Sequence, residues 1–191
     1  MIRESIITTI NDEDRIHIAP MGVTFDGQTP IIAPFQPSTT LDNLRSRSYA
    51  VVNYTDDVRV FAGCLTGRGD WPTRPATRVP GVVLELALAH AELKVTRIEE
   101  DDIRPRFHCA VVHEETHAPF EGFNRAQAAV IEAAILVSRL NMLPMEKIDS
   151  EIAYLEIAVS KTAGPDEREA WGWLMERIEK FKHENAEGKC A

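Results

Sequence analysis

The sequence predicts an α+β fold in which strands come first and close into a barrel, and helices follow. Short β-branched runs separated by turn signals fill the chain up to about residue 114. Beyond residue 120 the apolar residues recur at helical spacing. The chain has 191 residues, of which 44% are hydrophobic, so it can fill the core of one compact domain and is not disordered.

The first strands follow from residue type and turn chemistry. Residues 4–10 are rich in β-branched side chains, and residues 15–25 alternate apolar and polar positions. Pro20 has no N–H to donate, so we expect the second strand to be broken, bulged or at an edge there. The hairpin signal Asp26-Gly27 then leads into a third strand over residues 30–35.

One short helix and further strands complete the predicted barrel. Thr39 and Asp42 form a capping-box-like start, which predicts a helix over residues 40–47. A long loop over residues 66–81 contains three Pro, three Gly and three Arg, and loops of this length usually cover or bind something. Strands are expected on either side of this loop, over residues 49–54, 58–65, 82–99 and 104–114.

The C-terminal third is predicted to be helical. Asn124 is the expected N-cap of a helix over residues 124–142, which carries only a narrow charged stripe and is therefore expected to be buried. A helical hairpin follows, with Pro165 at the start of its second helix. We therefore divide the chain into residues 1–142, a barrel with the buried helix, and residues 143–191, a helical hairpin packed on the barrel.

Charge and cysteine content narrow the function classes. The net charge of −9 disfavours nucleic acid as a partner, because an acidic surface repels phosphate backbones. No apolar stretch is long enough to span a membrane and no signal-peptide pattern is present, so we expect a cytoplasmic protein without a membrane partner. The three cysteines form no C-x-x-C pair, and Cys64 and Cys109 are expected to be buried in strands and inert.

The stretch His113–His117 matches H-E-x-x-H, the pattern of zinc proteases. That chemistry needs both histidines on one face of a helix, but the preceding residues predict a strand and Ala118-Pro119 follow at once. In an extended chain the two histidines lie about 13 Å apart, too far to share one ion. We therefore expect a strand end or loop and no metal, and leave open a role for His113 or His117 near another site.

Ser38, Thr39 and Thr40 place three hydroxyls at the start of the predicted helix. Free N–H groups and the positive end of the helix dipole make such a place an anion site, and hydroxyls add donors to phosphate oxygens. The alternative is ordinary capping by Thr39, which explains only one hydroxyl.

The long loop carries three arginines beside Trp71, namely Arg68, Arg74 and Arg78. Such a cluster can clamp a carboxylate or phosphate, although an exposed loop on an acidic protein is the simpler interpretation. The Walker A, Rossmann and nucleophile-elbow motifs are absent from the sequence.

In their order along the chain, several motifs together resemble those of the FMN-binding split-barrel (flavin-reductase-like) superfamily. They are similar to one uncharacterised branch of methanogens and methylotrophs, which is associated with tetrahydromethanopterin-linked one-carbon transfer. The resemblance covers about residues 3–160. The matching segments are Ala19–Gly22, Ala33–Phe35, Pro37–Thr40 with Asn43-Leu44, Ala50–Asp57, Pro119–Ala126 and Ile131–Leu136.

The resemblance implies an FMN split barrel with C-terminal helices, which forms a homodimer with FMN near the interface. It places the phosphate at Ser38, Thr39, Thr40 and Asn43, and the isoalloxazine ring near Pro20, Met21, Gly22, Gln36 and Pro37. Asn53 is expected to reach the ribityl chain or phosphate. His113, Asn124 and Arg125 are candidates to enter the site from the partner subunit. The matched segments offer no acid or base, so no catalytic residue is nominated.

Three functions remain open on this basis. The first is an FMN-dependent oxidoreductase that acts on NAD(P)H or on a pterin of one-carbon metabolism. The second is an FMN carrier or electron-transfer module without a substrate of its own. The third is a dimeric scaffold that has lost its flavin affinity. Flavin would supply the redox chemistry in the first two.

Overall fold

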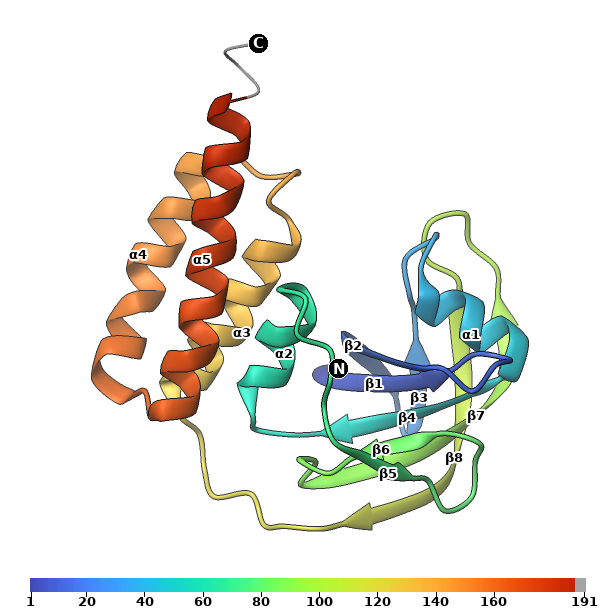
Figure 1. The fold of residues 1–191 in the computed structure, drawn as a ribbon. Coiled ribbons are helices and arrows are strands. Elements are labelled where there is room, and N and C mark those ends of the chain that lie inside the picture. Colours follow the sequence, from blue (N-terminus) through green and yellow to red (C-terminus); the bar gives the residue numbers. More distant parts are fainter. Residues whose placement is uncertain (188–191) are drawn as a thin grey trace. The chain divides into compact units, whose positions relative to one another are not determined.

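The computed structural model describes residues 1–187 and divides the chain into two compact units (Figure 1). The barrel unit contains residues 1–56 and 70–120. The helical unit contains residues 57–69 and the chain from Glu121 onward. The α+β class and the split β-barrel with C-terminal helices are confirmed.

Six antiparallel strands form a closed barrel in the order β1-β2-β3-β8-β7-β4, and β4 pairs back with β1. The strands are β1 (Ile2–Ile10), β2 (Ile16–Asp26), β3 (Thr29–Ile32), β4 (Tyr49–Tyr54), β7 (Ala89–Glu99) and β8 (Arg106–Thr116). Gly27 has a φ of 60° in the β2–β3 turn, a conformation that glycine adopts without strain. The hairpin signal in the sequence therefore marks a real turn.

The barrel core consists of alternate residues from its strands together with one helix. Ile7, Val23, Ile32, Leu93 and Phe107 are each at most 1% exposed and belong to one cluster. Helix α1 (Thr39–Arg47) adds Leu41 and Leu44 to it. This apolar contact fixes the position of α1, and with it the helix N-terminus that the sequence analysis singled out.

A small hairpin of β5 (Thr73–Pro75) and β6 (Val82–Leu84) is attached to the barrel by buried hydrogen bonds. Asn53 of β4 accepts from the Leu84 N–H at 2.8 Å and donates to the Ile6 carbonyl at 3.1 Å. Thr8 of β1 donates to the Val82 carbonyl. The long loop predicted over residues 66–81 thus contains a strand, and the strand predicted over residues 82–99 is two strands.

The helical unit consists of α2 (Val58–Leu65), α3 (Arg125–Ser138), α4 (Met145–Thr162) and α5 (Pro165–Glu187). Small and branched residues of α3 pack against the other three helices in one apolar cluster. Asn124 caps α3, as predicted, because its side chain accepts from the Ala126 N–H. None of the helices in residues 1–187 has the length and apolar character that a membrane crossing requires.

Two expectations about the helical unit need correction. Residues 58–65 were expected to form a strand, but they are α2: Asp57 caps the helix, and Val58 and Ala62 lie in the helical core. Cys64 is therefore on a helix and partly buried, whereas Cys109 is buried in β8 as expected. The helix expected over residues 124–142 ends at Ser138 and is grouped with the helical unit, not with the barrel. Cys190 lies outside the described residues.

Candidate functional site

The N-terminus of α1 provides hydrogen-bond donors for an anion. Ser38, not Thr39, is the N-cap, and its hydroxyl accepts from the Leu41 N–H at 3.3 Å. Within residues 1–187 the amides of Thr39 and Thr40 have no hydrogen-bond acceptor. The Thr39 side chain is exposed, whereas Thr40 is buried. Two backbone donors and one exposed hydroxyl therefore fit a phosphate group at this helix end.

Two of the predicted ligand-binding amides are occupied by the fold. Asn53 is 0% exposed, and its side-chain amide joins β1, β4 and β6 by hydrogen bonds. Its contact with the ribityl chain or phosphate stays a prediction. Asn43 is 3% exposed and donates to the Thr9 hydroxyl at 2.9 Å. Its role is to hold α1 against β1.

The segment before α1 borders an acidic hollow. Gln36 and Pro37 are exposed and joined by a cis peptide bond. The hollow beside Gln36 has a volume of about 420 Å³ and is otherwise lined by Arg45, Glu100, Asp101 and Asp102. Three carboxylates and one guanidinium make it unfavourable for a phosphate. An anion at α1 therefore has to avoid the Gln36 side.

Pro20, Met21 and Gly22 lie on β2 opposite Ile6, Ser5 and Glu4 of β1. All three are half-buried, so part of each residue stays accessible to a ligand. At Gly22 an added Cβ would lie 2.9 Å from Ile2 Cγ2, so the glycine accommodates the side chains of β1. The strand thus remains a candidate ring site, while Gly22 itself faces its neighbouring strand.

The three arginines of the predicted loop do not form one cluster with shared contacts. The Arg74 guanidinium lies 2.6 Å from Nε2 of His117. Arg78 contributes its backbone N–H to Glu92. Arg68 belongs to the helical unit. The structure therefore does not bring the three arginines together into one anion-binding site.

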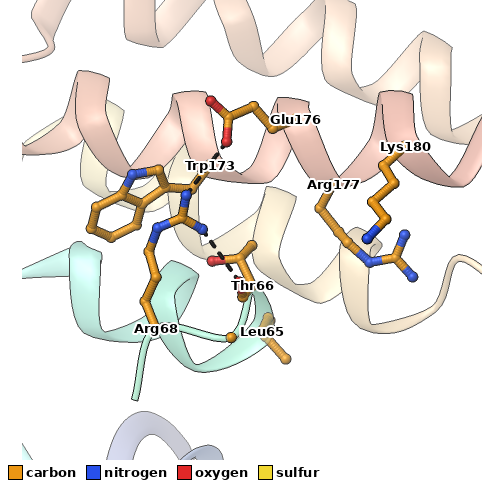
Figure 2. A pocket seen from close by; sticks show the side chains of 8 residues that line it. Leu65, Thr66, Arg68, Trp173, Glu176, Arg177 and Lys180 are labelled. Atoms are coloured by element: carbon orange, nitrogen blue, oxygen red, sulfur yellow. Dashed lines mark hydrogen bonds and ion pairs between the residues drawn. The ribbon is translucent and has the colours of Figure 1, made fainter. Parts of the chain in front are cut away.

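Arg68 lines a basic hollow of about 370 Å³ in the helical unit, which the sequence analysis missed (Figure 2). Its guanidinium stacks on Trp173 at 4.6 Å and contacts Glu176 at 3.4 Å. Arg177 and Lys180 line the same hollow, and Arg177 Nη1 is buried with no hydrogen-bond partner in the described chain. The lining thus carries a net positive charge, although the Arg68 guanidinium already contacts Trp173 and Glu176.

A second group of titratable residues spans the adjacent strands β7 and β8. His90 lies opposite Glu115, and Glu92 lies opposite His113, so all four share one face of the strand pair. His90 and Glu92 are 0% exposed in their side chains. Only the β8 residues of this group belong to the H-E-x-x-H pattern. The H-x-E spacing of His90 and Glu92 was the available signal, because residues two apart on a strand share a face.

Glu92 holds the loop that follows β5. One carboxylate oxygen accepts from the Thr77 N–H at 2.6 Å, and the other accepts from Arg78 at 2.6 Å and Val79 at 2.9 Å. Burial alone would raise the pKa of Glu92, but these N–H groups and His90 outweigh it and hold the pKa below its ordinary value. Glu92 is therefore a buried carboxylate.

His117 connects this group to the loop arginine. Its Nε2 lies 2.8 Å from Nδ1 of His90 and 2.6 Å from the Arg74 guanidinium. Burial and then the positive charge of Arg74 lower the pKa of His117. Because arginine can only donate, His117 Nε2 must be an acceptor and carries no proton.

Comparisons with known proteins were made for sequence and for structure. The family model described as "Protein of unknown function (DUF447) N-terminal domain" matches residues 3–118, and the model described as "Protein of unknown function (DUF447)" matches residues 124–176. The search of curated proteins finds no match.

Two solved structures share the fold. An FMN-bound DUF447 protein from Methanosarcina mazei is 21% identical, with a TM-score of 0.80 over 92% of this chain and 94% of that chain. The 2-nitrobenzoate 2-nitroreductase of Pseudomonas fluorescens is 20% identical, with a TM-score of 0.51 over 60% of this chain and 64% of that chain. The second likeness covers a smaller part of the chain. Because the two family models together span most of the sequence, the chain belongs to the DUF447 family.

Proposed function

We propose that this protein binds FMN, with the phosphate at the N-terminus of α1, and works as a flavin-dependent oxidoreductase. The observation that carries the proposal is the pair of free backbone amides of Thr39 and Thr40 at the start of α1, next to the N-cap Ser38. The fold of the chain matches that of an FMN-bound member of its family. FMN supplies hydride or single-electron transfer chemistry when bound.

The residues of this chain would position the ligand. The Thr39 and Thr40 amides and the exposed Thr39 hydroxyl donate to phosphate oxygens. The half-buried stretch Pro20–Gly22 of β2 offers a surface for the ring, and Asn43 and Asn53 act indirectly by fixing α1 and β4. The proposal includes a homodimer, which the family resemblance implies, and the exposed apolar residues Ile16 and Val112 are candidates for its interface.

An FMN carrier or electron-transfer module is the second candidate. The acidic lining of the hollow beside Gln36 favours it, because three carboxylates repel a phosphorylated dinucleotide such as NAD(P)H. A neutral or cationic redox partner meets no such repulsion. Nothing in the comparisons supports a tetrahydromethanopterin link, so the proposal does not include it.

The first experiment measures the visible absorption spectrum of the protein after FMN is added and the excess is removed. We expect a retained flavin spectrum in the wild type. In Thr39→Glu we expect at least a tenfold loss of affinity, because the carboxylate competes for the same donors and repels phosphate. A negative charge at a helix start stabilises the helix, so the variant should fold.

Ser46→Ala is the matched control, since it removes a hydroxyl from the other end of α1. Equal FMN affinity in the wild type and Thr39→Glu would refute the phosphate site, and a wild type that retains no FMN would refute the function. Bleaching of the flavin absorption by NADH or NADPH would favour the oxidoreductase. A flavin spectrum that neither compound changes would favour the carrier. Light scattering should give twice the 21.4 kDa of one chain.

A further inference from the structure

One buried nitrogen in the barrel unit has no partner. Nε2 of His113 is shielded from solvent and makes no hydrogen bond to any residue the structure describes. The Glu115 carboxylate lies 3.7 Å from this nitrogen, which is too far for a hydrogen bond. Native structures rarely leave a buried ring nitrogen without a partner, and a cation between this nitrogen and the carboxylate would satisfy both.

His90 completes a set of three ligand atoms. One atom each of His90, His113 and Glu115 lies within 4.8 Å of the other two. Donor atoms around a tetrahedral zinc ion are about 3.4 Å apart, so shifts of about 1 Å bring the three into position. His90 is buried, His113 is half-buried and Glu115 is exposed, which leaves the site open to solvent on one side.

Glu92 orients His90 for this role. Its carboxylate lies 3.3 Å from Nε2 of His90, and the three backbone N–H groups keep it ionised. Nε2 of His90 therefore faces a carboxylate, and Nδ1 faces His117. A carboxylate behind a histidine is the usual outer partner of a metal ligand.

The His90–His117 contact borders the same group of ligand atoms. Nδ1 of His90 faces Nε2 of His117 at 2.8 Å, and the Arg74 contact makes that Nε2 an acceptor. Nδ1 of His90 therefore faces an acceptor, and either a proton on Nδ1 or a metal ion beside the two rings satisfies the contact. Glu92 and Glu115 outnumber the single charge of Arg74, so the local balance favours a cation.

We propose that His90, His113 and Glu115 bind a divalent transition metal ion, best Zn²⁺, with the fourth position open to water or His117. Two histidines and one carboxylate with an open position are a ligand set typical of reactive zinc sites. The site uses part of the H-E-x-x-H sequence in another way. Glu114, the base position of that motif, alternates to the other strand face and takes no part. The proposal is independent of flavin binding.

The test is a titration of metal-free, tag-free protein with Zn²⁺ by calorimetry, and with Co²⁺ by visible absorption. We expect one equivalent to bind and the Co²⁺ complex to show the intense bands of tetrahedral coordination. His113→Ala and Glu115→Gln should each weaken binding at least tenfold. Arg74→Ala should tighten it, because the competing cation is gone.

His108→Gln is the matched control. His108 lies on the same strand pair and contacts Glu99 at 3.2 Å, but it is not one of the three ligands. The affinity of the His108→Gln variant for Zn²⁺ should equal that of the wild type. An equal loss in this variant, or wild-type binding no stronger than that of His113→Ala, overturns the proposal.

Side-chain ¹⁵N spectra of the wild type provide a readout that does not depend on variants. Zn²⁺ should shift Nδ1 of His90 and Nε2 of His113 and leave His108 unchanged. If these nitrogens do not respond to Zn²⁺, the metal site is overturned.

Discussion

Replacing Glu92 by Gln tests the buried network without changing its shape. The carboxylate satisfies three backbone N–H groups of the loop that follows β5, and its side chain is 0% exposed. A glutamine keeps one oxygen but puts an NH₂ group in place of the other. If the oxygen stays beside Arg78 and Val79, the NH₂ group points at the Thr77 N–H, and two donors meet without an acceptor.

The cost follows from these contacts. One charge-assisted hydrogen bond contributes about 1.5–3 kcal/mol, and a buried N–H without a partner costs about 1–3 kcal/mol. We therefore expect Glu92→Gln to lower the free energy of unfolding by about 3–5 kcal/mol. In a protein of this size that corresponds to a fall in Tm on the order of 10 °C.

Urea unfolding followed by circular dichroism measures this change. Glu114→Gln is the control, because Glu114 is an exposed carboxylate on the adjacent strand, and we expect its effect to stay within about 0.5 kcal/mol. A Glu92→Gln variant as stable as this control would refute the reasoning, since the three N–H groups would then have found water or another acceptor at no cost.

Three further predictions concern single residues. Asn53→Ala should lower the free energy of unfolding by about 2–4 kcal/mol in a urea titration, because the buried Ile6 and Leu84 backbone groups lose their partner. Burial lowers the pKa of His17 below 6.5, so its contribution to stability is full above pH 6.5 and is lost as the pH falls through the folded pKa. The His17→Gln variant should therefore lose less stability than the wild type between pH 8 and pH 5, and an identical loss would contradict this. Burial raises the pKa of Cys109 to about 12, which leaves a thiolate fraction on the order of 10⁻⁴ at pH 8. A thiol reagent should accordingly label Cys109 only after denaturation, as peptide mass spectrometry can show, and rapid labelling of native protein would refute its burial.

The sequence was informative wherever the signal is local. β-Branched alternation located the first strands, Asp26-Gly27 located a hairpin, and Asn124 located a helix cap, because each depends on the conformation of a few consecutive residues. The hydroxyls at Ser38–Thr40 predicted a helix start with free donors for the same reason. Only the identity of the cap, Ser38 and not Thr39, needed the structure.

Local signals failed where packing decides. Residues 58–65 have the composition of a buried strand, and only their packing against α3 and α5 makes them a helix. Asn53 matched a ligand-binding segment, but the position of β6 turned its amide into an internal support.

What the sequence determined by itself is the order of strands and helices and the donor-rich start of α1. What only the tertiary structure decided is which distant side chains meet. His113 lies 23 positions after His90 in the sequence. The β7–β8 register brings Glu115 directly opposite His90. That register includes two irregularities, between Glu92 and Leu93 and between Val95 and Arg97, which the spacing of residues along one strand does not reveal. For this reason the His90, His113 and Glu115 group appears in the structure and not in the H-E-x-x-H pattern.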